Sequence, residues 1–162
     1  MLSSGLHPLL LLLLTTTDPS WSLTDGDKKV IVEMHNLYRS QVSPSAADML
    51  KMSWDRELEA FAKAYATKCI WGHNKERGRR GENLFAITDE LDVQTAMEEW
   101  YNEHEYYNMT TTKCAEGQMC GHYTQVVWAS SKQVGCGAQF CKTLEGVEES
   151  DIYLLVCNYA PP

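Results

Sequence analysis

The chain has 162 residues, with 14 Lys and Arg against 22 Asp and Glu, which gives a formal net charge of −8. This acidic balance argues against general nucleic-acid binding, because a nucleic-acid interface needs a basic surface. The length allows a single domain. A chain of this size buries only about two-thirds of its unfolded surface, so disulfides would help to stabilise it.

The N-terminus has the pattern of a secretory signal peptide. Leu9 to Leu14 form an unbroken leucine run, which Thr15 to Pro19 interrupt. Ser20-Trp21-Ser22 then offers small residues at the two positions that a signal peptidase reads. The leucine run is too short to span a bilayer, which needs about 20 apolar residues. We therefore predict a signal peptide at residues 1–22 and a secreted, extracellular domain at residues 23–162, with no membrane span.

Three helices are expected in the first two-thirds of the chain. The first runs over residues 25–41, where Val30, Met34 and Tyr38 recur at helical spacing. The second runs over residues 55–69 and has one apolar stripe. The third runs over residues 92–107.

Strands are expected in the last third. Residues 134–141 alternate, with Val134, Cys136, Ala138 and Phe140 on one side, and residues 152–159 are rich in β-prone side chains. The acidic segment between them indicates a hairpin loop. Residues 121–128 are too short to assign from periodicity. Helices that cover a small antiparallel sheet give an α+β fold class.

The cysteines predict a disulfide framework. There are six: Cys69, Cys114, Cys120, Cys136, Cys141 and Cys157. An even number behind a signal peptide is typical of a secreted, disulfide-bonded domain. No Cys-x-x-Cys occurs, so zinc-ribbon and thioredoxin-like folds are excluded, and spacing alone leaves the pairing open.

Motifs of the common hydrolases and phosphate-binding folds are absent. The segment His104-Glu105-Tyr106-Tyr107-Asn108 differs from a zinc-protease helix because Asn108 stands where the second histidine ligand belongs. Two other histidines, His73 and His122, each follow a glycine, and Glu82 and Glu103 are acids in otherwise structured segments. Two imidazoles and two carboxylates suit a metal or proton-transfer site. From spacing alone, histidines in such positions are more often structural than part of a site.

Four motifs resemble those of the CAP family (cysteine-rich secretory proteins, antigen 5, pathogenesis-related 1). Gly121 to Trp128 and Leu154 to Pro161 resemble the two main signatures, and His35 to Arg39 and Gly81 to Leu84 resemble two shorter ones. They occur in the family's order over nearly the whole chain after residue 22. The resemblance implies a three-layer α-β-α sandwich with a central cleft.

The resemblance also implies particular site residues. The family's cleft tetrad falls on His73, Glu82, Glu103 and His122, although Glu99 lies one helical turn before Glu103. In some relatives the two histidines, here His73 and His122, hold a divalent ion, often zinc, which the fold does not require. The family's disulfides carry over as Cys69–Cys141, Cys136–Cys157 and Cys114–Cys120.

Some segments are expected at the surface or in the core. Asn108-Met109-Thr110 is a glycosylation sequon, which predicts an exposed loop. A basic cluster of Lys75, Arg77, Arg79 and Arg80 suggests either a patch for sulfated glycans or an acidic partner, or a solvated loop. The tryptophans Trp54, Trp71, Trp100 and Trp128 are predicted to belong to the core.

Three functional hypotheses remain open. The first is a non-catalytic binding domain for an extracellular protein or lipid, acting as a monomer. The second is a protease inhibitor, although no sequence feature identifies a reactive loop. The third is a hydrolase that uses His73 or His122 as a base, with Thr124 or Ser130 as the nucleophile. It is the weakest, because neither hydroxyl lies in a recognisable nucleophile motif.

Overall fold

The computed structural model describes residues 21–45 and 48–162. Almost all of the predicted signal peptide, residues 1–20, lies outside the described residues. The helices are α1 (Asp25–Ser40), α2 (Arg56–Ala66), α3 (Val93–Asn102), the 3₁₀ helix η1 (Glu103–Tyr106) and α4 (Gly121–Val126). The strands are β1 (Ser53–Trp54), β2 (Gly81–Ile87), β3 (Tyr107–Asn108), β4 (Lys113–Cys114), β5 (Gln133–Thr143) and β6 (Ser150–Ala160).

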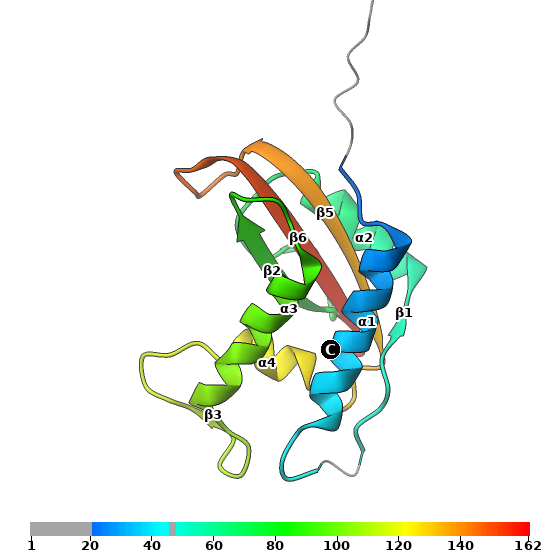
Figure 1. Cartoon of the computed structure of the whole chain (residues 1–162), viewed down its shortest axis with the longest axis vertical. Helices are drawn as coiled ribbons and strands as arrows, with labels where there is room; N and C mark the ends of the chain where they lie inside the picture. The colour runs from blue at the N-terminus through cyan, green and yellow to red at the C-terminus, as the bar shows by residue number, and fades with distance from the viewer. Residues whose placement is uncertain (1–20, 46–47) are drawn as a thin grey trace, which may run out of the picture.

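The main sheet has the strand order β1-β5-β6-β2. β5 and β6 form an antiparallel hairpin, β2 pairs antiparallel to β6, and the short β1 pairs parallel to β5. α2 lies on one face of this sheet, and α1, α3 and α4 lie on the other (Figure 1). The predicted α-β-α sandwich is therefore confirmed.

The β5 sequence explains how helices pack on both faces. Alternate residues from Val134 to Ala138 enter the core that α1, α3 and α4 share, as the alternation predicts. Between them, Gly135 and Gly137 face α2. A Cβ at Gly135 would lie 2.2 Å from the backbone nitrogen of Glu59, and one at Gly137 would lie 2.4 Å from the Cα of Lys63. Glycine at these two positions lets the α2 backbone rest directly on the strand.

The helix starts follow from side-chain caps. Thr24 and Asp27 form a reciprocal capping box at α1, Asp55 accepts from the backbone of Leu58 at α2, and Asp92 caps α3. Two helices end earlier than predicted. α2 stops at Ala66 instead of residue 69, because the chain turns through a positive φ at Cys69 to reach its disulfide partner. α3 stops at Asn102 instead of residue 107 and tightens into η1.

No strand was predicted at residues 81–87, where the structure forms β2. Its first residues, Gly81, Glu82 and Asn83, resemble a turn more than a strand. All three are buried, because β6 and the backbone groups of Asn74 and His122 supply hydrogen-bond partners. Local sequence carries no sign of those partners.

The three disulfides join the pairs that the family resemblance implied: Cys69–Cys141, Cys114–Cys120 and Cys136–Cys157. Cys136 and Cys157 are direct partners in the β5–β6 ladder, so their bridge cross-links the hairpin. Cys69–Cys141 ties the segment after α2 to β5. Cys114–Cys120 closes the loop that precedes α4.

The tryptophan prediction was half wrong. Trp100 is buried at 2% exposure, and Trp54 is half-buried. Trp71 and Trp128 are 42% and 50% exposed. Both lie in connecting segments outside helices and strands, where only part of an indole ring has a packing partner.

The His35–Arg39 motif forms a buried hydrogen-bond network. The Arg39 guanidinium donates to backbone carbonyls only: those of Leu50, Val126, Trp128, Ala129 and Ser131. These carbonyls belong to two segments, one at Leu50 and one from Val126 to Ser131. The Arg39 side chain therefore connects both segments to α1. Asn36 exchanges two hydrogen bonds with the backbone of Met52.

His35 is completely buried and neutral. Its Nδ1 lies 2.7 Å from the Ile31 carbonyl, which can only accept, so Nδ1 carries the proton. Its Nε2 then accepts from the Tyr159 hydroxyl at 2.8 Å. Burial lowers the pKa of His35 from 6.5 to about 4, with a smaller contribution from the charge of Arg39.

This buried imidazole predicts acid sensitivity. An unfolded chain binds a proton at His35 below about pH 6.5, whereas the folded chain resists protonation down to about pH 4. The free energy of unfolding should therefore lose about 3 kcal/mol between those pH values through this residue alone. Denaturant titrations at several pH values should give a shallower decline for His35→Gln than for the wild type. His104→Gln is the control, and an equally steep decline in His35→Gln would contradict the assignment.

Candidate functional site

His73 and Glu82 form the first of two His–Glu pairs. Nδ1 of His73 lies 2.9 Å from Oε1 of Glu82. The glutamate side chain is 1% exposed, whereas the imidazole is 55% exposed. Glu82 also accepts from the backbone nitrogen of Asn74 at 2.8 Å and from the amide of Asn158 at 3.1 Å. A fixed, buried carboxylate thus orients a histidine that faces solvent.

His122 and Glu103 form the second pair, which holds the start of α4. Nδ1 of His122 lies 2.7 Å from Oε2 of Glu103. Oε1 of the same carboxylate accepts from the backbone nitrogens of His122 and Tyr123 at 2.9 and 3.1 Å. Glu103 therefore supplies the cap that α4 lacks within its own sequence, and its negative charge is favourable at a helix N-terminus.

The structure distinguishes Glu103 from Glu99. Glu99 lies on the exposed side of α3, while Glu103 lies in η1 and contacts His122. After Asn102 the chain tightens from α3 into η1, and the Glu103 carboxylate reaches the first backbone nitrogens of α4.

The two pairs lie on either side of edge strand β2. Glu82 shares its face with Leu84, which packs under α2. The next residue, Asn83, faces the other way and donates from its side-chain amide to the backbone carbonyl of His122 at 3.1 Å. The four predicted tetrad residues thus form two separate pairs, one containing Glu82 and the other linked to Asn83 through the backbone carbonyl of His122.

No compact metal cluster is present among residues 21–45 and 48–162. Within these ranges, no group of three or more His, Cys, Asp or Glu side chains is arranged to hold a metal ion. The hydrogen bonds of both pair histidines use Nδ1 only. Any metal binding at these pairs would therefore rely on the two imidazole Nε2 atoms.

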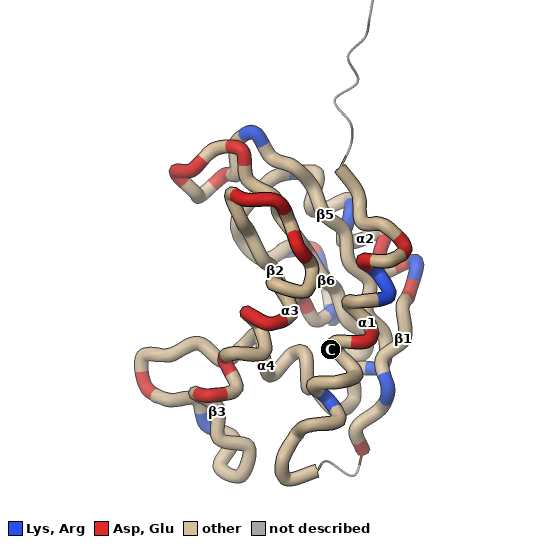
Figure 2. Tube along the Cα trace, in the orientation of Figure 1, with Lys and Arg blue, Asp and Glu red and all other residues tan. Residues whose placement is uncertain are grey.

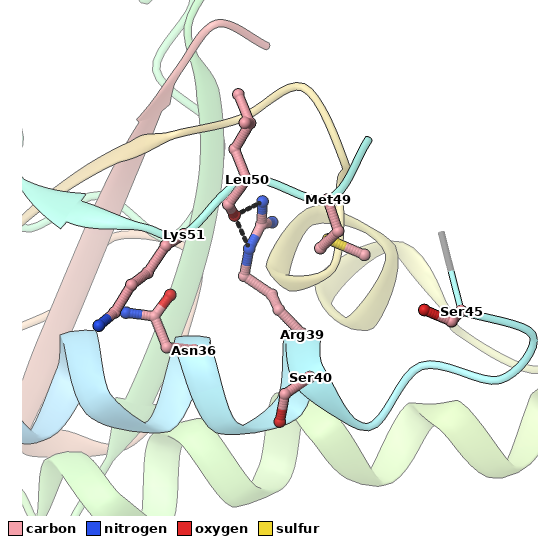
Figure 3. Close-up of a pocket in the computed structure, with 7 residues that line it drawn as sticks. All are labelled: Asn36, Arg39, Ser40, Ser45, Met49, Leu50 and Lys51. Carbon is pink, nitrogen blue, oxygen red and sulfur yellow. Dashed lines mark hydrogen bonds between the residues drawn. The ribbon is translucent and has the colours of Figure 1, made fainter. Parts of the chain in front are cut away.

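A pocket of about 400 Å³ lies beside the C-terminal half of α1 (Figure 3). Arg39 and Lys51 line it, which would suit an anionic ligand. The Arg39 guanidinium, however, points to the Leu50 carbonyl and is already occupied by backbone carbonyls (Figure 3). Its role is structural, so this pocket lacks the free fork of donors that an anion site needs.

A neighbouring pocket of about 330 Å³ has a mostly apolar lining, which sequence analysis did not identify. Its apolar residues include Val42, Met49, Tyr107, Met109, Val127 and Trp128. They come from three separate segments, so no local pattern announces them. The pocket also accounts for the exposure of Trp128, which forms part of its wall.

The predicted sequon residue Asn108 is exposed, as expected. It begins the turn between β3 and β4, where its side-chain oxygen accepts from the backbone nitrogens of Thr110 and Thr111. None of the helices in the described part of the chain is long and apolar enough to cross a membrane.

The three-layer fold, three disulfides and paired His and Glu residues define a CAP-type domain. The sequence profile of the CAP, or cysteine-rich secretory protein, family matches residues 32–159. This chain belongs to that family.

The curated proteins that this chain resembles support the same family assignment. The chain is 67% identical over 158 residues to human "Peptidase inhibitor 16", a match that covers 97% of this chain and 34% of that protein. It is 36% identical to human "Cysteine-rich secretory protein 2", over 83% of this chain and 56% of the relative. The chain therefore spans about a third of the length of the first of these relatives.

Solved structures share the fold. Schistosoma mansoni venom allergen-like protein 4 superposes with a TM-score of 0.69 and 27% identity, covering 86% of this chain and 90% of that one. A crystal structure of NaASP2 with Zn²⁺ gives the same TM-score and identity, covering 86% of this chain and 81% of that one.

The Glu103 contacts generate a stability prediction. Glu103→Gln keeps one acceptor oxygen but removes the charge that strengthens three hydrogen bonds at the start of α4. We expect the free energy of unfolding to fall by about 1–3 kcal/mol in urea titrations. Glu99→Gln removes the same charge from the exposed side of α3 and should change it by no more than about 0.5 kcal/mol. Equal effects of the two substitutions would refute the capping role.

Proposed function

We propose that this CAP domain is secreted and acts by binding an extracellular ligand, without catalysing a reaction. The observation that carries the proposal is the arrangement of His73 and His122. The Nδ1 atom of each contacts a glutamate fixed by the fold, and neither imidazole hydrogen-bonds to a hydroxyl or thiol among the described residues. The Nε2 atom of each imidazole can therefore bind a ligand, while no neighbouring nucleophile within the described ranges is present to attack it.

The candidate nucleophiles support the same proposal. Catalysis by an activated serine or threonine requires a hydroxyl within hydrogen-bond reach of a base. The Thr124 hydroxyl donates to the Gly121 carbonyl at 3.1 Å, a local contact within α4. Ser130 is exposed and makes no hydrogen bond with either imidazole. In the described part of the chain, neither hydroxyl is therefore paired with one of these histidines as a base.

We propose that a divalent ion binds at a two-histidine site. A carboxylate on the far nitrogen of a metal-binding histidine fixes the ring and raises its basicity, which is the role open to Glu82 and Glu103. Only Nε2 of His73 and Nε2 of His122 would bind directly, so water would complete the coordination. A bound cation would supply positive charge and exchangeable positions for an oxygen ligand. NaASP2, with the same fold, has been solved with Zn²⁺.

Zinc titration tests the site. Isothermal calorimetry of the oxidised, metal-free chain should detect about one zinc equivalent. His73→Ala and His122→Ala should each weaken binding at least tenfold, because each removes one of two direct ligands. Glu103→Gln should weaken it by roughly tenfold through loss of ring orientation. His104→Ala is the matched control. Unchanged affinity in both His73→Ala and His122→Ala would remove the metal site from the proposal.

The proposed partners are an extracellular protein or a lipid, bound by a monomeric chain that carries a glycan at Asn108. The apolar pocket beside Trp128 suits a lipid chain better than the pocket at Arg39, because its lining offers few polar groups. Secretion is supported by the N-terminal leucine run and the three disulfides.

Protease inhibition is the second candidate, and it is favoured by the name of the 67% identical relative, "Peptidase inhibitor 16". We expect neither hydrolysis of a peptide library by the pure chain nor stoichiometric inhibition across a panel of extracellular proteases. Tight one-to-one inhibition of any protease would replace the binding proposal with the inhibitor one. Turnover that His122→Ala abolishes would replace it with the hydrolase one.

A further inference from the structure

The loop between α2 and β2 carries a concentration of positive charge that opposes the charge of the chain. Residues 75–80 hold four of the 14 Lys and Arg residues and one acid, in a chain of formal net charge −8. Elsewhere, acidic residues predominate, for example at the turn between β5 and β6 (Figure 2). The basic loop is defined as Lys75, Glu76, Arg77, Gly78, Arg79 and Arg80.

The basic loop is held in one conformation by its own hydrogen bonds. Asn74 precedes it and is anchored to buried Glu82 through its backbone nitrogen at 2.8 Å. The Asn74 side chain accepts from the backbone of Glu76, and its carbonyl accepts from both the backbone and the side chain of Arg77. The Arg80 backbone and guanidinium both donate to the Arg77 carbonyl. The charges therefore sit on an ordered backbone.

None of the four cations has a carboxylate within 4.0 Å among the described residues. The acids nearest in sequence are Glu76 within the loop and Glu82, which is engaged by His73. Glu57 lies one turn before Phe61 on α2. The guanidinium carbon of Arg80 lies 4.0 Å from the centre of the Phe61 ring. Arg80 is thus positioned by an aromatic ring, a contact that leaves most of its donors free.

Exposure completes the description of the surface. Lys75, Arg79 and Arg80 are exposed, and Arg77 is half-buried. A flexible solvated loop would spread its cations and lose side-chain and backbone entropy on binding. An ordered loop avoids most of that cost, so its charges can act together on one ligand.

We propose that the basic loop binds a sulfated polysaccharide chain. Tetrahedral oxyanions match the fork of an arginine side chain, which can donate two parallel hydrogen bonds. A linear polyanion can contact several cations at once and release its condensed counterions, which drives association even with an acidic protein. The site lies outside the proposed metal-binding atoms and extends the proposed function to a second ligand.

A sulfated glycan fits better than an anionic membrane. Negative lipid charge is concentrated on the cytoplasmic leaflet, which an extracellular chain does not meet. A membrane-binding surface also presents apolar side chains for insertion, and residues 75–80 contain none. This choice rests on the extracellular location proposed above, whereas the binding assay itself does not depend on it.

Heparin binding by the oxidised chain tests the inference. Lys75 and Arg79 make no hydrogen bond or ion pair through their side chains among the described residues, so Lys75→Gln/Arg79→Gln should leave the loop folded. We expect this variant to bind immobilised heparin at least tenfold more weakly than the wild type. The slope of log affinity against log salt should fall by about two, one for each cation removed. Thermal unfolding of both proteins verifies that the fold is unchanged.

Lys29→Gln/Lys142→Gln is the matched control, since it removes two exposed cations that pair with Glu33 and Asp151 elsewhere. It should retain wild-type affinity. Equal weakening in both variants would mean attraction by overall charge and would overturn the proposal. So would equal binding to desulfated heparin, or binding to phosphatidylserine vesicles that depends on Lys75 and Arg79 in the absence of heparin binding. Loss of zinc binding would leave this result unaffected, so the two proposals fail separately.

Discussion

The short helix α4 depends on charged side chains from other elements at both of its ends. Six residues are too few for a helix to be stable alone. Glu103 accepts from the first backbone nitrogens, and Arg39 donates to the Val126 and Trp128 carbonyls at the other end. An anion at the N-terminus and a cation at the C-terminus both match the helix dipole. Because His122 sits in the first turn, its position is set by residues 19 and 83 positions earlier, in η1 and α1.

Edge strand β2 connects α4 to the main sheet through hydrogen bonds. Side chains alternate along a strand, so Glu82 faces α2 while Asn83 faces α4. Glu82 orients His73, and Asn83 donates both to the His122 carbonyl and, at 3.4 Å, to the Tyr159 hydroxyl that His35 uses. Gly81, which precedes them, packs against the side-chain amide of Gln125 in α4. Glu82 and Asn83 thus connect β2 to both His–Glu pairs.

The features best predicted from the sequence are those that local residue patterns determine. The starts of α1, α2 and α3 were predicted from apolar periodicity, and the structure caps them with Thr24, Asp55 and Asp92. β2 could not be predicted, because the partners that let Glu82 and Asn83 be buried come from distant segments. The disulfide pairing and the tetrad followed from family resemblance, since spacing left them open. The same resemblance selected Glu103 over Glu99, and the structure places the Glu103 carboxylate against His122.

The loop from His73 to Arg80 shows how one buried carboxylate can serve two surfaces. Glu82 is almost inaccessible, yet it holds His73 by its side chain and Asn74 by its backbone. Asn74 in turn fixes Glu76 and Arg77, so the order of the basic loop originates at the same carboxylate. Burying a charge is unfavourable unless hydrogen bonds satisfy it, and here the imidazole, the backbone and Asn158 do so. Removal of Glu82 would therefore disturb the histidine and the basic loop together, whereas substitutions at Lys75 or Arg79 affect the loop alone. This separation is what allows the two proposed ligands to be tested independently in a single domain.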